Sequence, residues 1–142
     1  MVDIAPKWNE PAIRVLMMPR DTNAHGTIFG GVILSYIDQA GAIEARRQGC
    51  GMMLTVSMDK IVFHQPVQVG DLVSFWTETL RIGTTSITTK VMVDSIRSAS
   101  RERVMVTEAQ VVYVNVDEKG RPTPISSPNH DGVVNARPSA TI

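Results

Sequence analysis

The sequence predicts an α+β domain in which one long antiparallel sheet curls around a single buried helix. Residues 30–47 are apolar on nearly every side of a helical wheel, a pattern typical of a helix that is buried all round. Four later segments alternate apolar and polar residues, and short connections join them, which favours antiparallel neighbours. One sheet and one helix leave strand edges and a helix side uncovered, so we expect a second copy of the chain to cover them.

The elements expected before the helix are short. Residues 1–12 contain two prolines and mixed polarity, which indicates an irregular arm. Residues 14–18 form a short apolar strand that Pro19 stops. Residues 21–29 are rich in Asp, Asn and Gly, the residue types that favour turns, and predict a polar loop.

The helix expected over residues 30–47 has recognisable ends. Two glycines open it, and two arginines near its end complement the negative pole of the helix dipole. Gly49 follows and is a plausible terminator.

Four strands are expected after the helix. The first alternates over residues 54–63 before Pro66 breaks it. The other three are expected over residues 72–82, 86–96 and 103–116. Together these elements predict one domain over residues 1–125 and a flexible C-terminal tail over residues 126–142, where Pro, Ser, Asn and Gly dominate.

The composition excludes several classes of protein. The chain has 142 residues, 43% of them hydrophobic and 20% charged, which is an ordinary globular balance for one domain. Fourteen basic residues offset fourteen acidic ones, which argues against a general nucleic-acid binder. No apolar stretch approaches the ~20 residues that cross a bilayer, and the first residues lack a secretory signal. We therefore expect a cytoplasmic protein with neither nucleic acid nor membrane as partner.

Cysteine and histidine usage argues against a metal centre. Cys50 is the only cysteine, so neither an intrachain disulfide nor a cysteine-rich zinc site is possible. His25, His64 and His130 lie far apart and match no recognised metal-ligand spacing. We expect no metal or resident cofactor, and we expect His64 to end a strand beside the proline turn.

Asp38 is the residue that most needs an explanation. It lies in the middle of the most apolar segment of the chain, where an ionised carboxylate is costly unless it is paired or near water. Ser35, Gly41 and Ala42 are small and leave space beside it on the helix. Two interpretations stay open: a structural carboxylate paired with an arginine, or a catalytic carboxylate at a water-accessible cleft.

The start of the helix and the loop before it offer further candidates. Free N–H groups at Gly30 and Gly31 could hold an anion or a carbonyl oxygen, although a tight loop also needs glycine. Asn23 could orient a water molecule or a carbonyl, although loop asparagines often make local hydrogen bonds. His25 could act as a base or be merely solvated. The turn from Gly83 to Ser86 could hold an extended ligand or be a simple hairpin.

These residues resemble a known family. Residues 18–47, 55–73, the turn at 83–86 and the end of the last strand at 116–122 are similar to the hotdog-fold acyl-CoA thioesterases of the YciA type, which are related to the brain-type acyl-CoA hydrolases. The loop Asn-x-x-Gly-x-x-x-Gly-Gly followed by Asp on the helix is the most specific part. Phe29 departs from the brain-type pattern, which has His before the glycine pair.

The resemblance implies a hotdog fold whose sheets pair into one continuous sheet in a dimer, with dimers assembled into a hexamer. It implies active sites at the dimer interface, with a catalytic Asn and a catalytic acid that match Asn23 and Asp38 and come from different protomers. It also implies contacts with coenzyme A at Gly30, Gly31, Val56, Ser57, Gly83 and Ser86. A basic group for the CoA 3′-phosphate is expected among Lys90, Arg97, Arg101 and Arg103.

The activity expected from this pattern is hydrolysis of acyl-CoA to a free carboxylic acid and CoA, a step of fatty acid metabolism. The thioester carbonyl would lie at the helix start, with Asp38 activating a water or attacking the carbonyl itself. One alternative is a hotdog dehydratase or hydratase, for which His25 is the candidate base, and crotonyl-thioester hydration would distinguish it. Another is a non-catalytic acyl-CoA sensor, which would bind without releasing thiol. The acyl chain length stays open.

Overall fold

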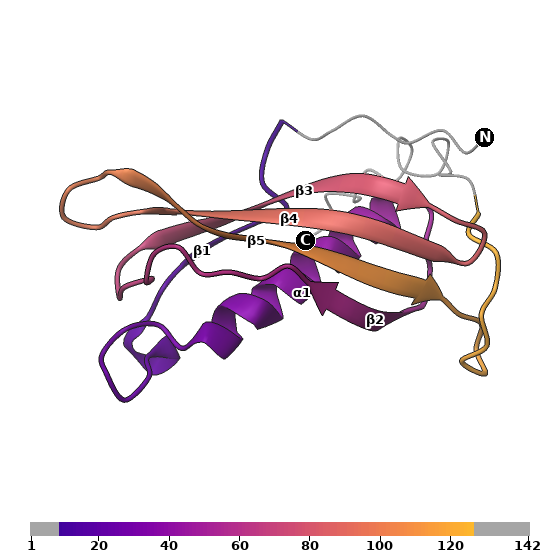
Figure 1. The fold of residues 1–142 in the computed structure, drawn as a ribbon, viewed down its shortest axis with the longest axis horizontal. Coiled ribbons are helices and arrows are strands. Elements are labelled where there is room, and N and C mark those ends of the chain that lie inside the picture. Colours follow the sequence, from indigo (N-terminus) through magenta and orange to yellow (C-terminus); the bar gives the residue numbers. More distant parts are fainter. Residues whose placement is uncertain (1–8, 127–142) are drawn as a thin grey trace, which may run out of the picture.

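The computed structural model describes residues 9–126, and the predicted tail at 126–142 lies almost entirely outside them. One helix packs against a five-stranded antiparallel sheet with strand order β1-β3-β4-β5-β2, as Figure 1 shows. The strands are β1 (Ile13–Leu16), β2 (Met53–Asp59), β3 (Leu72–Ile82), β4 (Ser86–Ile96) and β5 (Arg103–Asn115). The helices are α1 (Gly30–Arg47) and the short 3-10 turn η1 (Pro19–Asp21). No helix in residues 9–126 is long and apolar enough to cross a membrane.

Most of the predicted elements are confirmed. The helix and the strands β3 and β4 have the predicted bounds, and β5 ends one residue before the predicted 116. β3, β4 and β5 form a meander of antiparallel neighbours, as their short connections predict. They form the central part of the sheet, against which α1 lies.

The prediction for the strand after the helix was wrong in two respects. β2 ends at Asp59 rather than continuing to 63, because Lys60 adopts a positive φ of 60° and turns the chain. β2 also pairs with β5, not with β3, so residues 60–71 cross the domain to the other side of the sheet. The predicted short connection does not exist at this point.

The crossing segment packs against neighbouring chain segments instead of joining the β2 ladder. The N–H of His64 donates to the carbonyl of Val106 at 2.8 Å, and the N–H of Ile28 donates to the carbonyl of Val67 at 2.8 Å. His64 therefore lies outside any strand, contrary to its prediction. Val62 and Phe63 of this segment are 60% and 43% exposed, so its apolar residues do not form the buried face of a strand.

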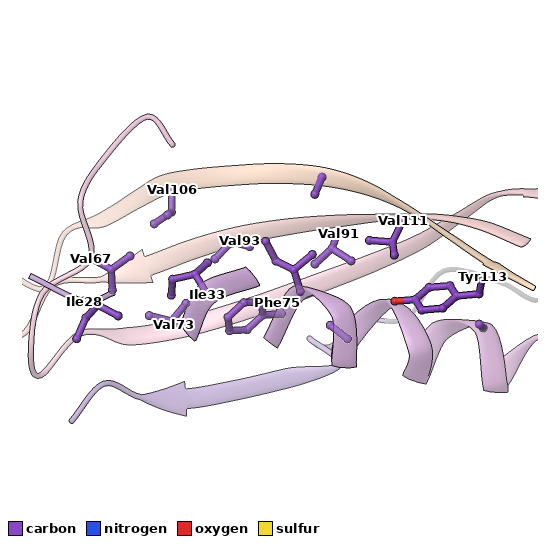
Figure 2. Packing of buried hydrophobic residues seen from close by; sticks show 14 of the residues in the cluster. Ile28, Ile33, Val67, Val73, Phe75, Val91, Val93, Val106, Val111 and Tyr113 are labelled. Carbon is purple, nitrogen blue, oxygen red and sulfur yellow. The ribbon is translucent and has the colours of Figure 1, made fainter. Parts of the chain in front are cut away.

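The core lies between one face of α1 and the sheet (Figure 2). The buried helix residues recur at three- and four-residue spacing: Ile33, Ile37, Ala40, Gly41, Glu44 and Ala45. Facing them are buried strand residues that include Phe75, Val91, Val93, Val111 and Tyr113. Burial of each large apolar side chain contributes about 1.5–3 kcal/mol, before the entropy cost of ordering the chain.

The other side of α1 is only partly buried in a single chain, as expected for a helix that packs against one sheet. Val32, Leu34, Ala42 and Ile43 keep part of their surface exposed in a single chain, so the helix is not enclosed all round. The edge strand β2 also exposes apolar side chains, since Leu54 and Val56 are 55% and 60% exposed. These exposed apolar residues lie on the helix side and the strand edge that a single chain was expected to leave uncovered.

Glu44 is a fully buried carboxylate on the core face of α1. Its oxygens accept hydrogen bonds from Arg47 at 2.6 Å, Thr79 at 2.9 Å and Thr77 at 3.0 Å, and from Gln48 at 3.3 Å. Burial by itself raises the pKa of Glu44, but Arg47 and the two threonines outweigh it and hold this pKa below its usual value. The network joins the end of the helix to β3.

Replacing Glu44 with Ala is expected to lower the free energy of unfolding by about 3 kcal/mol, because it breaks a buried network and removes the acceptor of the Thr77 and Thr79 hydroxyls. Urea denaturation at pH 7 measures this loss. The matched control is Glu108→Ala, because Glu108 is 56% exposed and pairs with Lys90 only at 3.5 Å; a change below about 0.5 kcal/mol is expected.

The same network predicts a pH dependence of stability. A carboxylate whose pKa is lower in the folded state stabilises the protein above its unfolded pKa, and this contribution is lost as pH falls through the folded pKa. Unfolding free energies measured from pH 7 down to pH 3 should therefore decline less steeply below about pH 4.5 in Glu44→Gln than in the wild type. Parallel curves would contradict an ionised Glu44.

Candidate active site

Asp38 lies two turns into α1, half-buried, beside β2. The hydroxyl of Thr55 donates a hydrogen bond to its Oδ1 at 2.8 Å, and the hydroxyl of Tyr113 donates to its backbone carbonyl at 2.5 Å. Within residues 9–126 Asp38 forms no salt bridge, so the structural interpretation with an arginine partner is not realised in one chain. A carboxylate offers about four acceptor positions, so the Thr55 contact leaves capacity to bind water.

The helix start presents two backbone donors. Phe29 caps α1 without a side-chain hydrogen bond, and the N–H of Val32 bonds to its carbonyl at 3.0 Å. The N–H groups of Gly30 and Gly31 have no acceptor among the residues that the structure describes. A Cβ at Gly31 would lie 2.5 Å from the ring of Phe29, so a larger residue there would require this exposed ring to move. These donors and the positive helix end can hold a developing oxyanion.

Two hollows flank the glycine pair. A cavity of about 300 Å³ on the Gly30 side is lined by Thr27, Ile28, Ile33, Phe63, His64, Gln65, Pro66 and Val67. A shallower hollow of about 400 Å³ on the Gly31 side is lined by Phe29, Val32, Ser35, Tyr36 and Gln39. Neither is lined by Asp38, so one chain does not bring the carboxylate and the helix start into the same cavity.

Asn23 is held by its own loop. Its Oδ1 accepts hydrogen bonds from the backbone N–H groups of His25 at 2.8 Å and Thr27 at 3.2 Å, and its Nδ2 donates to the Thr27 hydroxyl at 2.8 Å. The local hydrogen-bonding interpretation of Asn23 is therefore confirmed. Nδ2 carries two hydrogens, and only one of them has an acceptor in the part of the chain that the structure describes, so the other N–H can meet a ligand. His25 is exposed.

The two candidate catalytic residues lie apart in a single chain. Gly30 and Asp38 are eight helical residues apart, roughly 12 Å at about 1.5 Å per residue. Asn23 precedes the helix start, and no hydrogen bond within residues 9–126 joins it to Asp38. Oxyanion donors must lie about 3 Å from the oxygen of the reacting carbonyl. The N–H groups at the helix start and the carboxylate of Asp38 in one chain are therefore too far apart to act on the same carbonyl group.

The remaining candidates lie along the sheet rather than at the helix start. A bulge between Thr55 and Ser57 leaves Val56 outside the regular pairing with β5, and Val56 is exposed. In the turn between β3 and β4, the N–H of Gly83 donates to the carbonyl of Ser86 at 2.8 Å, which confirms a hairpin. On β5, Ser86 pairs with Val114, which is next to Tyr113, the residue that pairs with Thr55.

Most of the basic residues considered for a CoA phosphate are already paired. Arg97 forms a 2.6 Å salt bridge with buried Asp71, and Arg103 forms one with buried Asp94. Lys90 lies 3.5 Å from Glu108. Arg101 forms no ion pair within the described part of the chain. The geometry of one chain therefore selects no phosphate-binding residue from this group of four.

Comparison with known proteins identifies the family. Residues 25–98, which include both Asp38 and the glycine pair, match the model of the thioesterase superfamily. The chain belongs to this superfamily. It is 41% identical over 113 residues to the acyl-CoA thioester hydrolase YciA of Escherichia coli, an alignment that covers 78% of this chain and 86% of the relative.

Solved thioesterase structures confirm the predicted hotdog fold. A hexameric hotdog-fold thioesterase of Campylobacter jejuni is similar with a TM-score of 0.79 and 45% identity, covering 83% of this chain and 91% of that one. A hexameric broad-specificity acyl-coenzyme A thioesterase gives a TM-score of 0.80 and 39% identity, covering 88% and 86%. The superfamily resemblance predicted from the sequence is thus confirmed.

Thr55 and Tyr113 were not predicted to belong to the site of this thioesterase-superfamily chain. Both contact Asp38, although they lie 17 and 75 residues from it in sequence. Thr55 is an ordinary polar residue of an alternating strand, and only its position beside Val56 and Ser57 hinted at a role. Tyr113 is the only aromatic residue of the valine-rich strand β5, and its role at the site becomes visible only with the fold.

Proposed function

We propose that this chain is an acyl-CoA thioesterase that converts an acyl-CoA and water into a carboxylic acid and free CoA. The observation that carries the proposal is the carboxylate of Asp38, which accepts a hydrogen bond from Thr55 of β2. It lies on α1, whose first two N–H groups have no acceptor within residues 9–126, in a member of the thioesterase superfamily. Relatives named acyl-CoA thioester hydrolases support the substrate class.

Each active site of this proposal combines two protomers. One supplies Asn23 and the N–H groups of Gly30 and Gly31, which lie close together in the chain at the helix start. The partner supplies Asp38, because Asp38 of the same chain is roughly 12 Å along the helix. Such an arrangement is symmetric, so a dimer contains two equivalent sites.

The chemistry assigned to these groups is hydrolysis of the thioester. The two glycine N–H groups stabilise the negative charge that develops on the carbonyl oxygen, about 3 kcal/mol for each donor. Asp38 either takes a proton from the attacking water or attacks the carbonyl to give an anhydride that water then hydrolyses. In both routes the C–S bond breaks, the CoA thiolate gains a proton, and the acyl group gains a hydroxyl. The free N–H of Asn23 orients the water or the carbonyl.

The coenzyme A portion is proposed to lie along β2 and the neighbouring hairpin. Val56 is bulged and exposed, so its backbone groups can approach a ligand, and Ser57 follows it. Gly83 and Ser86 lie two strands away at the same end of the sheet as the start of β2. A cytoplasmic location completes the proposal, and cell fractionation tests it.

Oligomerisation is proposed to follow the hexameric relatives, with β2 pairing to a second copy. β2 is an edge strand, and its exposed Leu54 and Val56 are apolar. Leu54→Lys is expected to shift the protein toward monomers in size-exclusion chromatography with light scattering, and to lose thiol release. Leu80→Lys, which charges an exposed leucine of β3, is the control. A fully active monomer would contradict the two-protomer site.

A thiol-release assay across acyl-CoA substrates of increasing chain length tests the function itself. Release of CoA at rates far above the uncatalysed reaction is expected, with the chain-length profile identifying the preferred substrates. Hydration of a crotonyl thioester without thiol release would instead support a hydratase, and tight acyl-CoA binding without either reaction would support a sensor. No contact of His25 favours the hydratase, since its side chain is exposed in the loop.

A further inference from the structure

Tyr113 connects the sheet to the backbone of Asp38. It is 1% exposed, and its ring lies between β5 and α1, as Figure 2 shows. Its hydroxyl donates to the carbonyl of Asp38 at 2.5 Å, a bond between residues 75 positions apart. In a regular helix this carbonyl already accepts a hydrogen bond from the N–H of the residue four positions later. The hydroxyl of Tyr113 is therefore a second donor that the helix does not need for its own stability.

Gly41 makes this contact possible. A Cβ at this position would collide with the hydroxyl oxygen of Tyr113 and would lie 2.9 Å from Oγ1 of Thr89. Glycine in the middle of a helix costs about 1 kcal/mol relative to alanine. The helix therefore accepts a less stable residue at the one place where the tyrosine hydroxyl approaches it.

Tyr113 and Thr55 form one row of the sheet. They are direct partners in the pairing of β2 with β5, so their side chains project from the same face toward α1. Thr55 holds the carboxylate of Asp38, and Tyr113 holds its backbone. The bond from Tyr113 thus fixes the position of the helix backbone at Asp38, and the bond from Thr55 fixes the direction of its carboxylate.

We propose that Tyr113 is a positioning residue for Asp38, which sets the distance between this carboxylate and the thioester through its bond to the helix backbone. The inference rests on the proposed thioesterase function. Misplacement of a catalytic group by about 1 Å can lower the rate by two orders of magnitude, so a backbone anchor at this residue has a direct kinetic effect.

The electrostatics keep the tyrosine in the donor form. Burial raises the pKa of Tyr113 far above its usual range, and the negative charge of Asp38 raises it further. The hydroxyl therefore stays protonated near neutral pH, where it can donate to the carbonyl of Asp38.

The test compares Tyr113→Phe with Thr89→Val. Both remove one buried hydroxyl next to Gly41, but the Thr89 hydroxyl bonds to the carbonyl of Val111 at 3.4 Å rather than to Asp38. Tyr113→Phe is expected to lower kcat about tenfold while KM for acyl-CoA changes less than about twofold. Thr89→Val is expected to keep kcat. Similar shifts in melting temperature for the two variants would show that lost stability is not the cause.

Two further measurements separate the possible failures. In an Asp38→Asn background, Tyr113→Phe should cause no additional loss of kcat, because it acts only through that carboxylate. Tyr113→Phe should also recover part of the melting temperature that Gly41→Ala loses, since it removes the colliding oxygen. Wild-type protein that releases no thiol would overturn the proposed function and this role together. Normal thiol release with an unchanged kcat in Tyr113→Phe would overturn the role of Tyr113 alone.

Discussion

Replacing Asp38 with Asn is expected to lower kcat/KM for acyl-CoA hydrolysis about a thousandfold. The substitution keeps the size of the side chain and an oxygen that can accept the Thr55 hydroxyl, at 2.8 Å from Oδ1 in the wild type. It removes the negative charge that the base or nucleophile needs, and a positioned acid–base group typically contributes 10²–10⁴-fold. The loss should appear in kcat, with KM nearly unchanged, because the missing interaction belongs to the transition state.

Steady-state thiol release with the wild type and Asp38→Asn measures this effect. Asp59→Asn is the matched control, because Asp59 is an exposed carboxylate on the same strand as Thr55 and should leave the rate within about twofold. Circular dichroism melting of all three proteins checks that the fold is kept. A kcat/KM for Asp38→Asn within tenfold of the wild type would remove Asp38 from the chemistry.

Replacing Asn23 with Asp is expected to lower kcat about a hundredfold. The new carboxylate can still accept the backbone N–H groups of His25 and Thr27, and the Thr27 hydroxyl can rotate to donate to it instead of accepting from Nδ2. It loses the spare amide N–H that is proposed to face the substrate, and one such donor is typically worth 10²–10³-fold. Asn23→Ala is a less selective variant, because it also breaks the bonds inside the loop.

Mixing the two variants tests whether the site spans two protomers. Co-expression of Asp38→Asn with Asn23→Asp, followed by purification through two different tags, yields heterodimers with one intact and one doubly altered site. The purified heterodimers should show roughly half of wild-type activity, because one of their two sites is intact. Activity that stays at the level of the separate variants would contradict the shared site.

The site was only partly predictable from sequence. Asp38 and the glycine pair stand out locally, because a charge in an apolar helix and two glycines at its start are unusual in themselves. Glu44 was missed, since a glutamate near a helix end is usually solvated. Its burial depends on Thr77 and Thr79 of β3, more than 30 residues away.

The sequence by itself determined the helix over residues 30–47, three of the four later strands and the packing of one sheet around one helix, because periodicity and turn residues are local preferences of the backbone. The hotdog fold itself was implied by the resemblance to a known family. Only the tertiary structure decided that β2 pairs with β5 across the domain, and that Thr55 and Tyr113 therefore meet Asp38. Strand pairing depends on which surfaces meet after the chain has folded, and no short segment carries that information.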